Sequence, residues 1–137
     1  MFLRYRISLS LSLIFYLAFL AWLSLLPPSF FSPDLMNFKG ADKMVHAAIY
    51  AMLSFLLFIL FIDFSRKSPK QKFVIIFIIA SGYGLLMELL QLWIKSAMRS
   101  FEISDIIANC VGVLAGIIFG YTFSPFLIKR MVSKPDF

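Results

Sequence analysis

Long apolar runs alternate with short polar connections along this chain. A helix that spans a bilayer needs about 20 consecutive, mostly apolar residues. Such runs cover residues 7–26, 44–62, 73–94 and 104–123. The connections between them carry charged residues, proline and glycine, which suit loops. The pattern therefore predicts an all-α membrane protein built as a four-transmembrane-helix bundle.

The first apolar run also resembles a signal sequence, because Arg4 and Arg6 precede it. At about 20 residues it is longer than a typical signal-peptide core, which has 7–15 apolar residues. No small-x-small cleavage site follows it, and Pro27 and Pro28 end the run. We therefore predict that residues 7–26 form an uncleaved membrane helix.

The composition supports the membrane interpretation. Of the 137 residues, 61% are hydrophobic and 15% are charged, whereas a soluble domain has about 25% charged residues. We expect one membrane domain over residues 1–137. The formal net charge of +6 does not indicate nucleic-acid binding, because the basic residues flank the apolar runs, where topology and anionic lipid account for them. Cys110 is the single cysteine, so no internal disulfide can form.

The basic residues are distributed unequally between the two sides of the predicted bundle. With four spans, the N-terminus, the 63–72 connection and the C-terminal tail share one side. That side carries nine basic residues: Arg4, Arg6, Arg66, Lys67, Lys70, Lys72, Lys129, Arg130 and Lys134. The other side carries four: Lys39, Lys43, Lys95 and Arg99. Because Lys and Arg are enriched in cytoplasmic loops, we predict that both termini are cytoplasmic.

Polar residues interrupt the apolar pattern on both sides of the loop between the third and fourth runs. Glu88 and Gln91 are three residues apart, and Asp105 and Asn109 are four apart. Each pair therefore shares one helix face. Helices joined by a short loop are antiparallel neighbours, so we expect these two polar faces to meet near the turn.

A third polar stripe opens the second run. Asp42, His46 and Tyr50 step by four residues, and Lys43 follows the first of them. In the predicted topology this stripe lies on the outer side, at the same depth as the polar faces of the third and fourth spans. Ionisable groups in spanning segments usually face the protein interior or a water-filled cavity. We therefore interpret the three segments as the walls of one polar site near the outer membrane face.

The residue types suggest separate roles within this site. His46, Glu88 and Asp105 are the catalytic candidates, because they can exchange protons. The ligand-binding candidates are Asp42, Lys43, Tyr50, Gln91, Arg99 and Asn109. The guanidinium of Arg99 suits a phosphate or carboxylate, and Lys43 or Lys95 would assist it.

Structural explanations remain open for several of these residues. Glu88 could form a salt bridge with Arg99 or Lys43. Gln91 and Asn109 could join helices by hydrogen bonds. Gly112 and Gly116 continue the face of Asp105 and Asn109, and with Gly120 they form a small-residue face. This face is assigned to helix packing, because small residues allow close approach of membrane helices.

Other kinds of chemistry have weaker support from the sequence. His46 with Glu88 and Asp105 would suit a hard or borderline metal ion, but their spacing follows no zinc motif, so we predict no metal and no cofactor. A hydrolase would need Ser104 or Tyr50 as nucleophile with His46 as base. A proton or ion pathway is disfavoured, because the inner halves of the spans lack acids.

Two motifs resemble those of the VanZ-like family of small bacterial membrane proteins. The first is Asp42-Lys43-Met-Val-His46-Ala-Ala-Ile-Tyr50. The second is Glu88-Leu-Leu-Gln91 followed by Arg99, Asp105, Asn109, Gly112 and Gly116. The resemblance extends over about residues 39–121, which is most of the chain.

This resemblance implies a role in the bacterial cell envelope, as a multi-pass protein of the inner (cytoplasmic) membrane. The namesake of the family is associated with reduced susceptibility to the glycopeptide teicoplanin. The resemblance brings no settled reaction, substrate or cofactor. We expect a site that binds or modifies an anionic envelope lipid or a lipid-linked precursor. The alternative is a non-catalytic accessory subunit whose polar cluster only locks the helices together. The sequence does not separate an enzyme from a binding protein, and it gives no oligomeric state.

Overall fold

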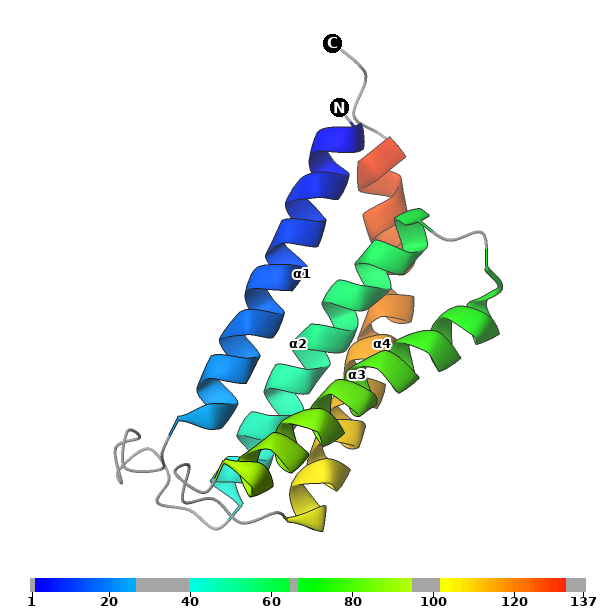
Figure 1. Ribbon diagram of the computed structural model, residues 1–137. Helices are drawn as coiled ribbons and strands as arrows, with labels where there is room; N and C mark the ends of the chain where they lie inside the picture. Colours follow the sequence, from blue (N-terminus) through cyan, green and yellow to red (C-terminus); the bar gives the residue numbers. More distant parts are fainter. Residues whose placement is uncertain (1, 27–39, 65–66, 95–101, 133–137) are drawn as a thin grey trace.

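Residues 2–26, 40–64, 67–94 and 102–132 are described by a computed structural model (Figure 1). In these ranges the chain forms four helices: α1 (Phe2–Leu25), α2 (Ala41–Phe64), α3 (Pro69–Trp93) and α4 (Ile103–Val132). Each helix is long and apolar enough to cross a membrane. The predicted all-α architecture with four spans is confirmed.

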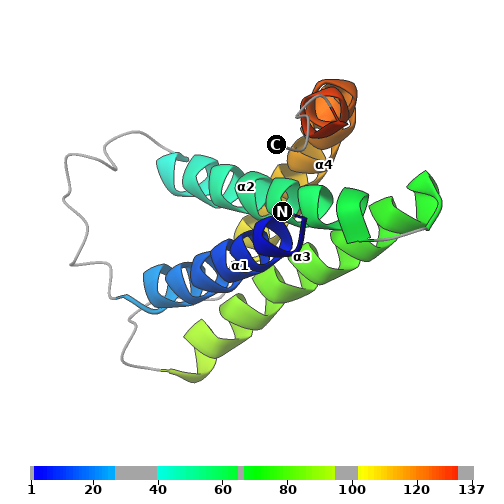
Figure 2. The same ribbon diagram turned by 90° about the horizontal axis from the view of Figure 1, so that it is seen from above.

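The helices alternate in direction along the bundle (Figure 1). α1 and α3 end where α2 and α4 begin, and we refer to this end of the molecule as the cluster end. α3 crosses the other helices obliquely, as both ribbon views show (Figures 1 and 2). The polar segments singled out in the sequence are the start of α2, the end of α3 and the start of α4. All of them therefore lie at the cluster end.

Apolar side chains form both the core and much of the outer surface of the bundle. The core consists of Leu20, Tyr50, Leu53, Leu57, Phe58, Ile76, Ala80, Val113 and Ile117. Outside, large side chains such as Phe15, Ile78 and Ile118 are 75%, 63% and 62% exposed. Soluble monomers rarely carry extensive apolar patches on the surface, whereas hydrocarbon tails solvate such side chains. The exterior is therefore suited to lipid.

Glycine residues on α4 allow it to pack closely against α2. A Cβ atom added at Gly112 would collide with the backbone of Ala47, and one added at Gly116 would collide with the backbone of Ala51. Helices in membranes associate through such small residues, because the backbones can then approach and gain van der Waals contact. These glycines therefore set the distance between the helices that carry His46 and Asp105.

Hydrogen bonds from α3 attach it to α1. The Tyr83 hydroxyl donates to the Leu17 carbonyl at 2.6 Å, and Gln91 Nε2 donates to the Ser24 carbonyl at 2.7 Å. A buried polar group in an apolar setting is costly without such a partner. These bonds fix the position of α1 along the helix that carries Glu88.

α3 begins before the predicted residue 73, because polar residues cap its first turn. Ser68 is the N-cap and forms a capping box with Gln71, while Pro69 occupies the first turn. In the box the backbone N–H groups of Ser68 and Gln71 donate to each other's side chains, which satisfies two free donors at the helix start. A boundary placed by hydropathy alone missed this polar first turn.

α4 continues past the predicted end at residue 123, and Pro125 lies inside the helix. Proline usually ends or kinks a helix, because it lacks the N–H that would bond the carbonyl four residues earlier. That carbonyl belongs to Tyr121, and the Ser124 hydroxyl donates to it at 2.9 Å. The serine therefore replaces the missing backbone donor, so the helix can continue.

Candidate functional site

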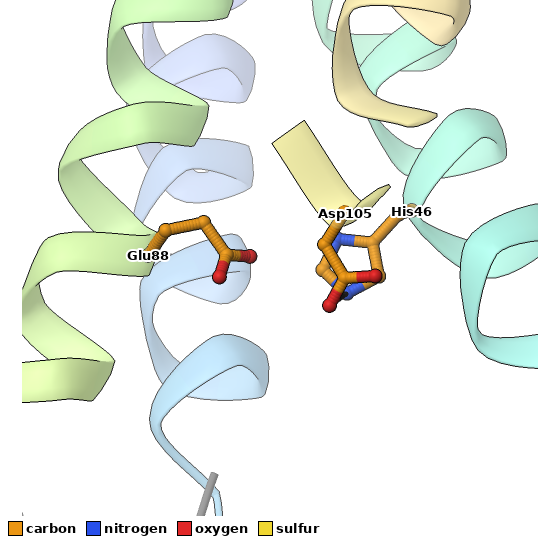
Figure 3. Close-up of side chains that lie close together, drawn as sticks. All are labelled: His46, Glu88 and Asp105. Atoms are coloured by element: carbon orange, nitrogen blue, oxygen red, sulfur yellow. Dashed lines mark ion pairs between the residues drawn. The ribbon is translucent and has the colours of Figure 1, made fainter. Parts of the chain in front are cut away.

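His46, Glu88 and Asp105 come together at the cluster end, although they lie on three different helices (Figure 3). One nitrogen or oxygen atom from each residue lies within 4.8 Å of those of the other two. In Figure 3 the Glu88 carboxylate points from α3 toward the other two side chains. We refer to these residues as the three-helix cluster. Their convergence shows that the spacing of polar residues in the sequence corresponds to a shared location.

The imidazole of His46 is held between two side chains of α4. Its Nδ1 lies 3.0 Å from Asn109 Oδ1, and its Nε2 lies 3.8 Å from Asp105 Oδ2. With the amide oxygen as acceptor, Nδ1 carries the proton and donates to it. In neutral imidazole the lone pair then resides on Nε2. Asn109 therefore directs a basic nitrogen toward Asp105.

The carboxylate of Asp105 is oriented by a second partner. Its Oδ1 accepts a hydrogen bond from Lys43 Nζ at 2.9 Å, which leaves Oδ2 toward His46. Asp105 lies in the first turn of α4, where its N–H bonds to the Glu102 carbonyl at 3.0 Å. Negative charge is favourable at a helix N-terminus. The start of α4 thus supplies both the position and a stabilising field for this carboxylate.

Lys43 bonds to three carboxylates at once. Its Nζ lies 2.8 Å from Asp42, 3.1 Å from Glu102 and 2.9 Å from Asp105. An ammonium group has three N–H donors, and these contacts use all of them. We expected Lys43 to help hold an anionic headgroup, but in this arrangement its ammonium links the starts of α2 and α4 instead. The Ser104 hydroxyl also donates to Glu102, at 3.1 Å.

Glu88 is the most deeply buried acid of the three-helix cluster, with 1% of its surface exposed. Its carboxylate and that of Asp105 approach within 4.8 Å. If both were ionised, they would repel each other by at least about 3 kcal/mol at an effective dielectric constant of about 20. Such a pair is stable when a proton or a cation lies close to it, and the Lys43 ammonium, 2.9 Å from Asp105, already compensates part of this charge. The cluster is therefore suited to proton exchange or to cation binding.

Tyr50 and Asn109 lie deeper in the bundle, beside the three-helix cluster. Both are 1% exposed. A Cβ atom added at Gly84 would lie 3.0 Å from Asn109 Nδ2 and 3.1 Å from Tyr50 Cε1. The absence of a side chain at Gly84 therefore makes room for both groups between α2, α3 and α4.

Glu102 and Gly84 also belong to the site, although neither follows from the polar pattern of the sequence. Glu102 bonds Lys43, and this hydrogen bond lowers the pKa of its carboxyl group below the ordinary value. Glu102 precedes Asp105 by three residues, which is about one helical turn. This spacing could have indicated that both carboxylates lie on the same side of the start of α4. Gly84 precedes Glu88 by four residues and thus lies on the same face of α3. A small residue in that register indicates close packing beside a polar side chain.

Other predicted site residues are placed differently. Gln91 is buried and bonds to Ser24 on α1, so its amide acts as a tie between helices. Asp42 lies at the rim, with a side chain that is 45% exposed. Arg99 and Lys95, the other cations expected at the site, lie outside the residues that the structure describes.

Comparison with known proteins adds one finding. A family model described as VanZ/LLP1 matches residues 13–124, which extends from α1 to near the end of the apolar part of α4. No curated protein and no solved structure matches the chain. The family match confirms the resemblance carried by the two polar motifs.

Proposed function

Because the chain belongs to the VanZ/LLP1 family, we propose that it is a cell-envelope membrane protein whose cluster end binds a lipid headgroup. The ligand class is an anionic envelope lipid or a lipid-linked envelope precursor. We also propose that the protein influences the susceptibility of the cell to glycopeptides, and teicoplanin is the compound used to test this. It covers binding with or without chemical modification of the ligand.

The observation that carries the proposal is the three-helix cluster itself. His46, Glu88 and Asp105 lie within apolar helices that are long enough to span a membrane. A charged side chain costs about 2.5–3.5 kcal/mol at the centre of a membrane helix and less near its ends, where these residues lie. Three helices each bring an ionisable group to the same place. Ionisable groups in such segments usually mark ligand or proton sites.

The proposed site faces the outer side of the bacterial inner membrane. Its orientation is inferred from the excess of Lys and Arg on the side of the termini, because such residues favour the cytoplasm. Trp93 ends α3 at the cluster end and is 83% exposed. Tryptophan is enriched at membrane–water interfaces, so this end would lie at headgroup depth.

The chemistry available at the site favours hydrogen-bonding and proton exchange with a polar headgroup. His46 Nε2 is a base aimed at Asp105, and Glu88 adds a second carboxylate. An anionic group would also need positive charge. Lys43 is already bonded to three carboxylates. We therefore propose that Arg99 and Lys95 supply this charge, since they belong to the connection between α3 and α4 at the cluster end.

The proposal is tested by comparing His46→Ala and Glu88→Gln with Ser54→Ala in cells that lack the native protein. Ser54 is a buried polar residue of the same helix as His46, and its hydroxyl bonds within that helix. Three quantities are measured: abundance in the membrane, phospholipid and lipid-linked precursor that copurify with the protein, and teicoplanin susceptibility. We expect normal abundance for all variants, with loss of the bound lipid and of the phenotype only in the two cluster variants. Wild-type behaviour of both cluster variants would contradict the proposal.

A non-catalytic structural role is the second candidate, and specific contacts favour it. Lys43 joins α2 to α4, and Gln91 joins α3 to α1. If the polar residues act only as such ties, His46→Ala and Glu88→Gln will reduce membrane abundance, whereas Ser54→Ala will not. The same experiment therefore distinguishes the two candidates.

A further inference from the structure

We propose that His46, Glu88 and Asp105 bind a first-row divalent cation, of the Zn²⁺ or Mn²⁺ type. The spacing of these residues in the sequence does not predict a metal site. The geometry supports one, because a nitrogen and two carboxylate oxygens converge within 4.8 Å from three helices. The metal site deepens the proposed function, since it lies at the same location, but it can be tested independently.

The orientation of the imidazole is the first independent support. Asn109 Oδ1 lies 3.0 Å from His46 Nδ1, so a neutral imidazole that donates to this oxygen has its lone pair on Nε2. That nitrogen lies 3.8 Å from Asp105 Oδ2, which is also an electron-pair donor. Two such donors facing each other attract a cation between them. Histidine ligands of metals usually donate their other N–H to an oxygen in this way.

The orientation of Asp105 is the second support. Lys43 occupies its Oδ1, so Oδ2 is the oxygen left for the three-helix cluster. Ligating carboxylates are themselves commonly held by outer hydrogen bonds. Both the imidazole and the carboxylate therefore have an orienting partner outside the cluster, and both direct their remaining donor inward.

Burial and ligand type limit which cations fit. His46 and Asp105 side chains are each 14% exposed, and Glu88 is 1% exposed, so the ion would be largely removed from bulk water. An imidazole ligand favours first-row transition ions, whereas Mg²⁺ and Ca²⁺ prefer oxygen ligands alone. Three protein ligands leave a coordination position open, as in catalytic zinc sites. A phosphate oxygen of a headgroup could take that position.

A second group of carboxylates, next to the three-helix cluster, already binds a cation, the ammonium of Lys43. Asp42, Glu102 and Asp105 also place oxygen atoms within 4.8 Å of one another. The Lys43 ammonium bonds to all of them. The ammonium therefore already neutralises that grouping, and Glu102, which is not part of the three-helix cluster, provides a control for metal binding.

The test measures metal binding by the full chain, purified in detergent and stripped with a chelator. Zn²⁺, Mn²⁺ and Mg²⁺ are added separately and followed by calorimetry and by elemental analysis after desalting. We expect one tightly bound Zn²⁺ or Mn²⁺ per chain and no comparable uptake of Mg²⁺. His46→Ala and Asp105→Asn should abolish this uptake, and Asn109→Ala should weaken it by about 10- to 100-fold.

A control variant excludes nonspecific adsorption to acids. Glu102→Gln removes a carboxylate that bonds Lys43 but leaves the three-helix cluster intact, so this variant should bind Zn²⁺ as the wild type does. Equal losses in Glu102→Gln and in His46→Ala would overturn the proposal. Absence of both Zn²⁺ and Mn²⁺ uptake by the wild type would also overturn it. This holds even if Arg99→Ala then gains uptake, because that result would show that a guanidinium occupies the position in the native protein.

A measurement on the unmodified chain covers the case in which ligand variants fail to fold. Co²⁺ bound by the His46 nitrogen and the carboxylates should give a visible d–d absorption band. This band should disappear when added Zn²⁺ displaces the Co²⁺ ion, and absence of the band would count against the site.

The lipid proposal is separable from the metal proposal. If Zn²⁺ binds but His46→Ala keeps its copurified lipid, the lipid proposal fails alone. If His46→Ala loses the lipid but the wild type binds no Zn²⁺ or Co²⁺, the metal proposal fails alone.

Discussion

His46 on α2 and Asn109 on α4 lie 3.0 Å apart, from Nδ1 to Oδ1, and this hydrogen bond connects the two polar motifs. It fixes the ring orientation of the histidine and selects Nδ1 as the protonated nitrogen. Because Asn109 is 1% exposed, its amide has little access to water as an alternative partner. The pair therefore determines how His46 faces Asp105.

Asn109→Ala should destabilise the bundle by about 1–3 kcal/mol, because it leaves the His46 Nδ1–H without its acceptor. The measurement is thermal or denaturant unfolding of the purified protein in detergent. Ile107→Ala is the control on the same helix, since Ile107 is 59% exposed and faces outward. A loss as large in the control as in Asn109→Ala would argue against a specific role of the hydrogen bond.

Gly112→Ala and Gly116→Ala should each destabilise the packing of α2 against α4 by about 1–3 kcal/mol or more, as overpacking does. Their new methyl groups would meet the backbone of Ala47 and Ala51, which cannot move without shifting α2. Gly82→Ala provides the matched control, because nothing lies within 4 Å of its Cβ position. Alanine favours a helix interior over glycine by about 0.5–1 kcal/mol, so this variant should be neutral or stabilised. Unfolding in detergent checks all three, and equal stability of the three variants would contradict the packing model.

Acidification should weaken the contact between Lys43 and Glu102. The Lys43 hydrogen bond lowers the pKa of Glu102 below its ordinary value of 4.5. A lowered folded-state pKa gives a stabilisation that is complete above the unfolded value and is lost as the pH falls through the folded value. We expect unfolding temperatures to fall on acidification below about pH 4.5, and to fall less steeply in Glu102→Gln. An identical pH profile for the variant and the wild type would show that this ion pair does not contribute.

Gln91→Leu should leave the candidate site functional, because Gln91 bonds to Ser24 on α1 rather than to the three-helix cluster. Loss of one hydrogen bond between membrane helices costs about 0.6 kcal/mol on average and up to about 1.7 kcal/mol. The checks are unfolding in detergent together with lipid copurification. A variant of normal stability that has lost its lipid would instead assign Gln91 to the site.

The helices were predictable because long apolar runs permit few alternatives in a membrane, but their ends were not. The start of α3 depends on the capping box of Ser68 and Gln71, and such polar first turns are not visible in hydropathy. The path of α4 through Pro125 depends on one hydroxyl, that of Ser124, bonding the Tyr121 carbonyl. Local hydrogen bonds decided both boundaries.

The grouping of His46, Glu88 and Asp105 was predictable from spacing and topology, whereas the partners of individual side chains were not. Helical periodicity placed each residue on a face, and antiparallel packing brought the faces together. The sequence could not show that Lys43 bonds three carboxylates. One of them, Glu102, precedes the fourth apolar run, and helical periodicity assigns no face to a residue in a loop. The direction of the Gln91 amide toward α1 likewise depends on the oblique crossing of α3, visible in Figure 1.

The close contact between the glycine face of α4 and α2 has a consequence for biogenesis. These two helices are not consecutive, because α3 lies between them in the chain. During translation α2 and α3 precede α4, so the helices that carry His46 and Glu88 leave the ribosome before the helix that carries Asp105 and Asn109. A nascent chain halted before α4 would hold these two ionisable groups without their later partners, and full assembly waits for the insertion of the final span.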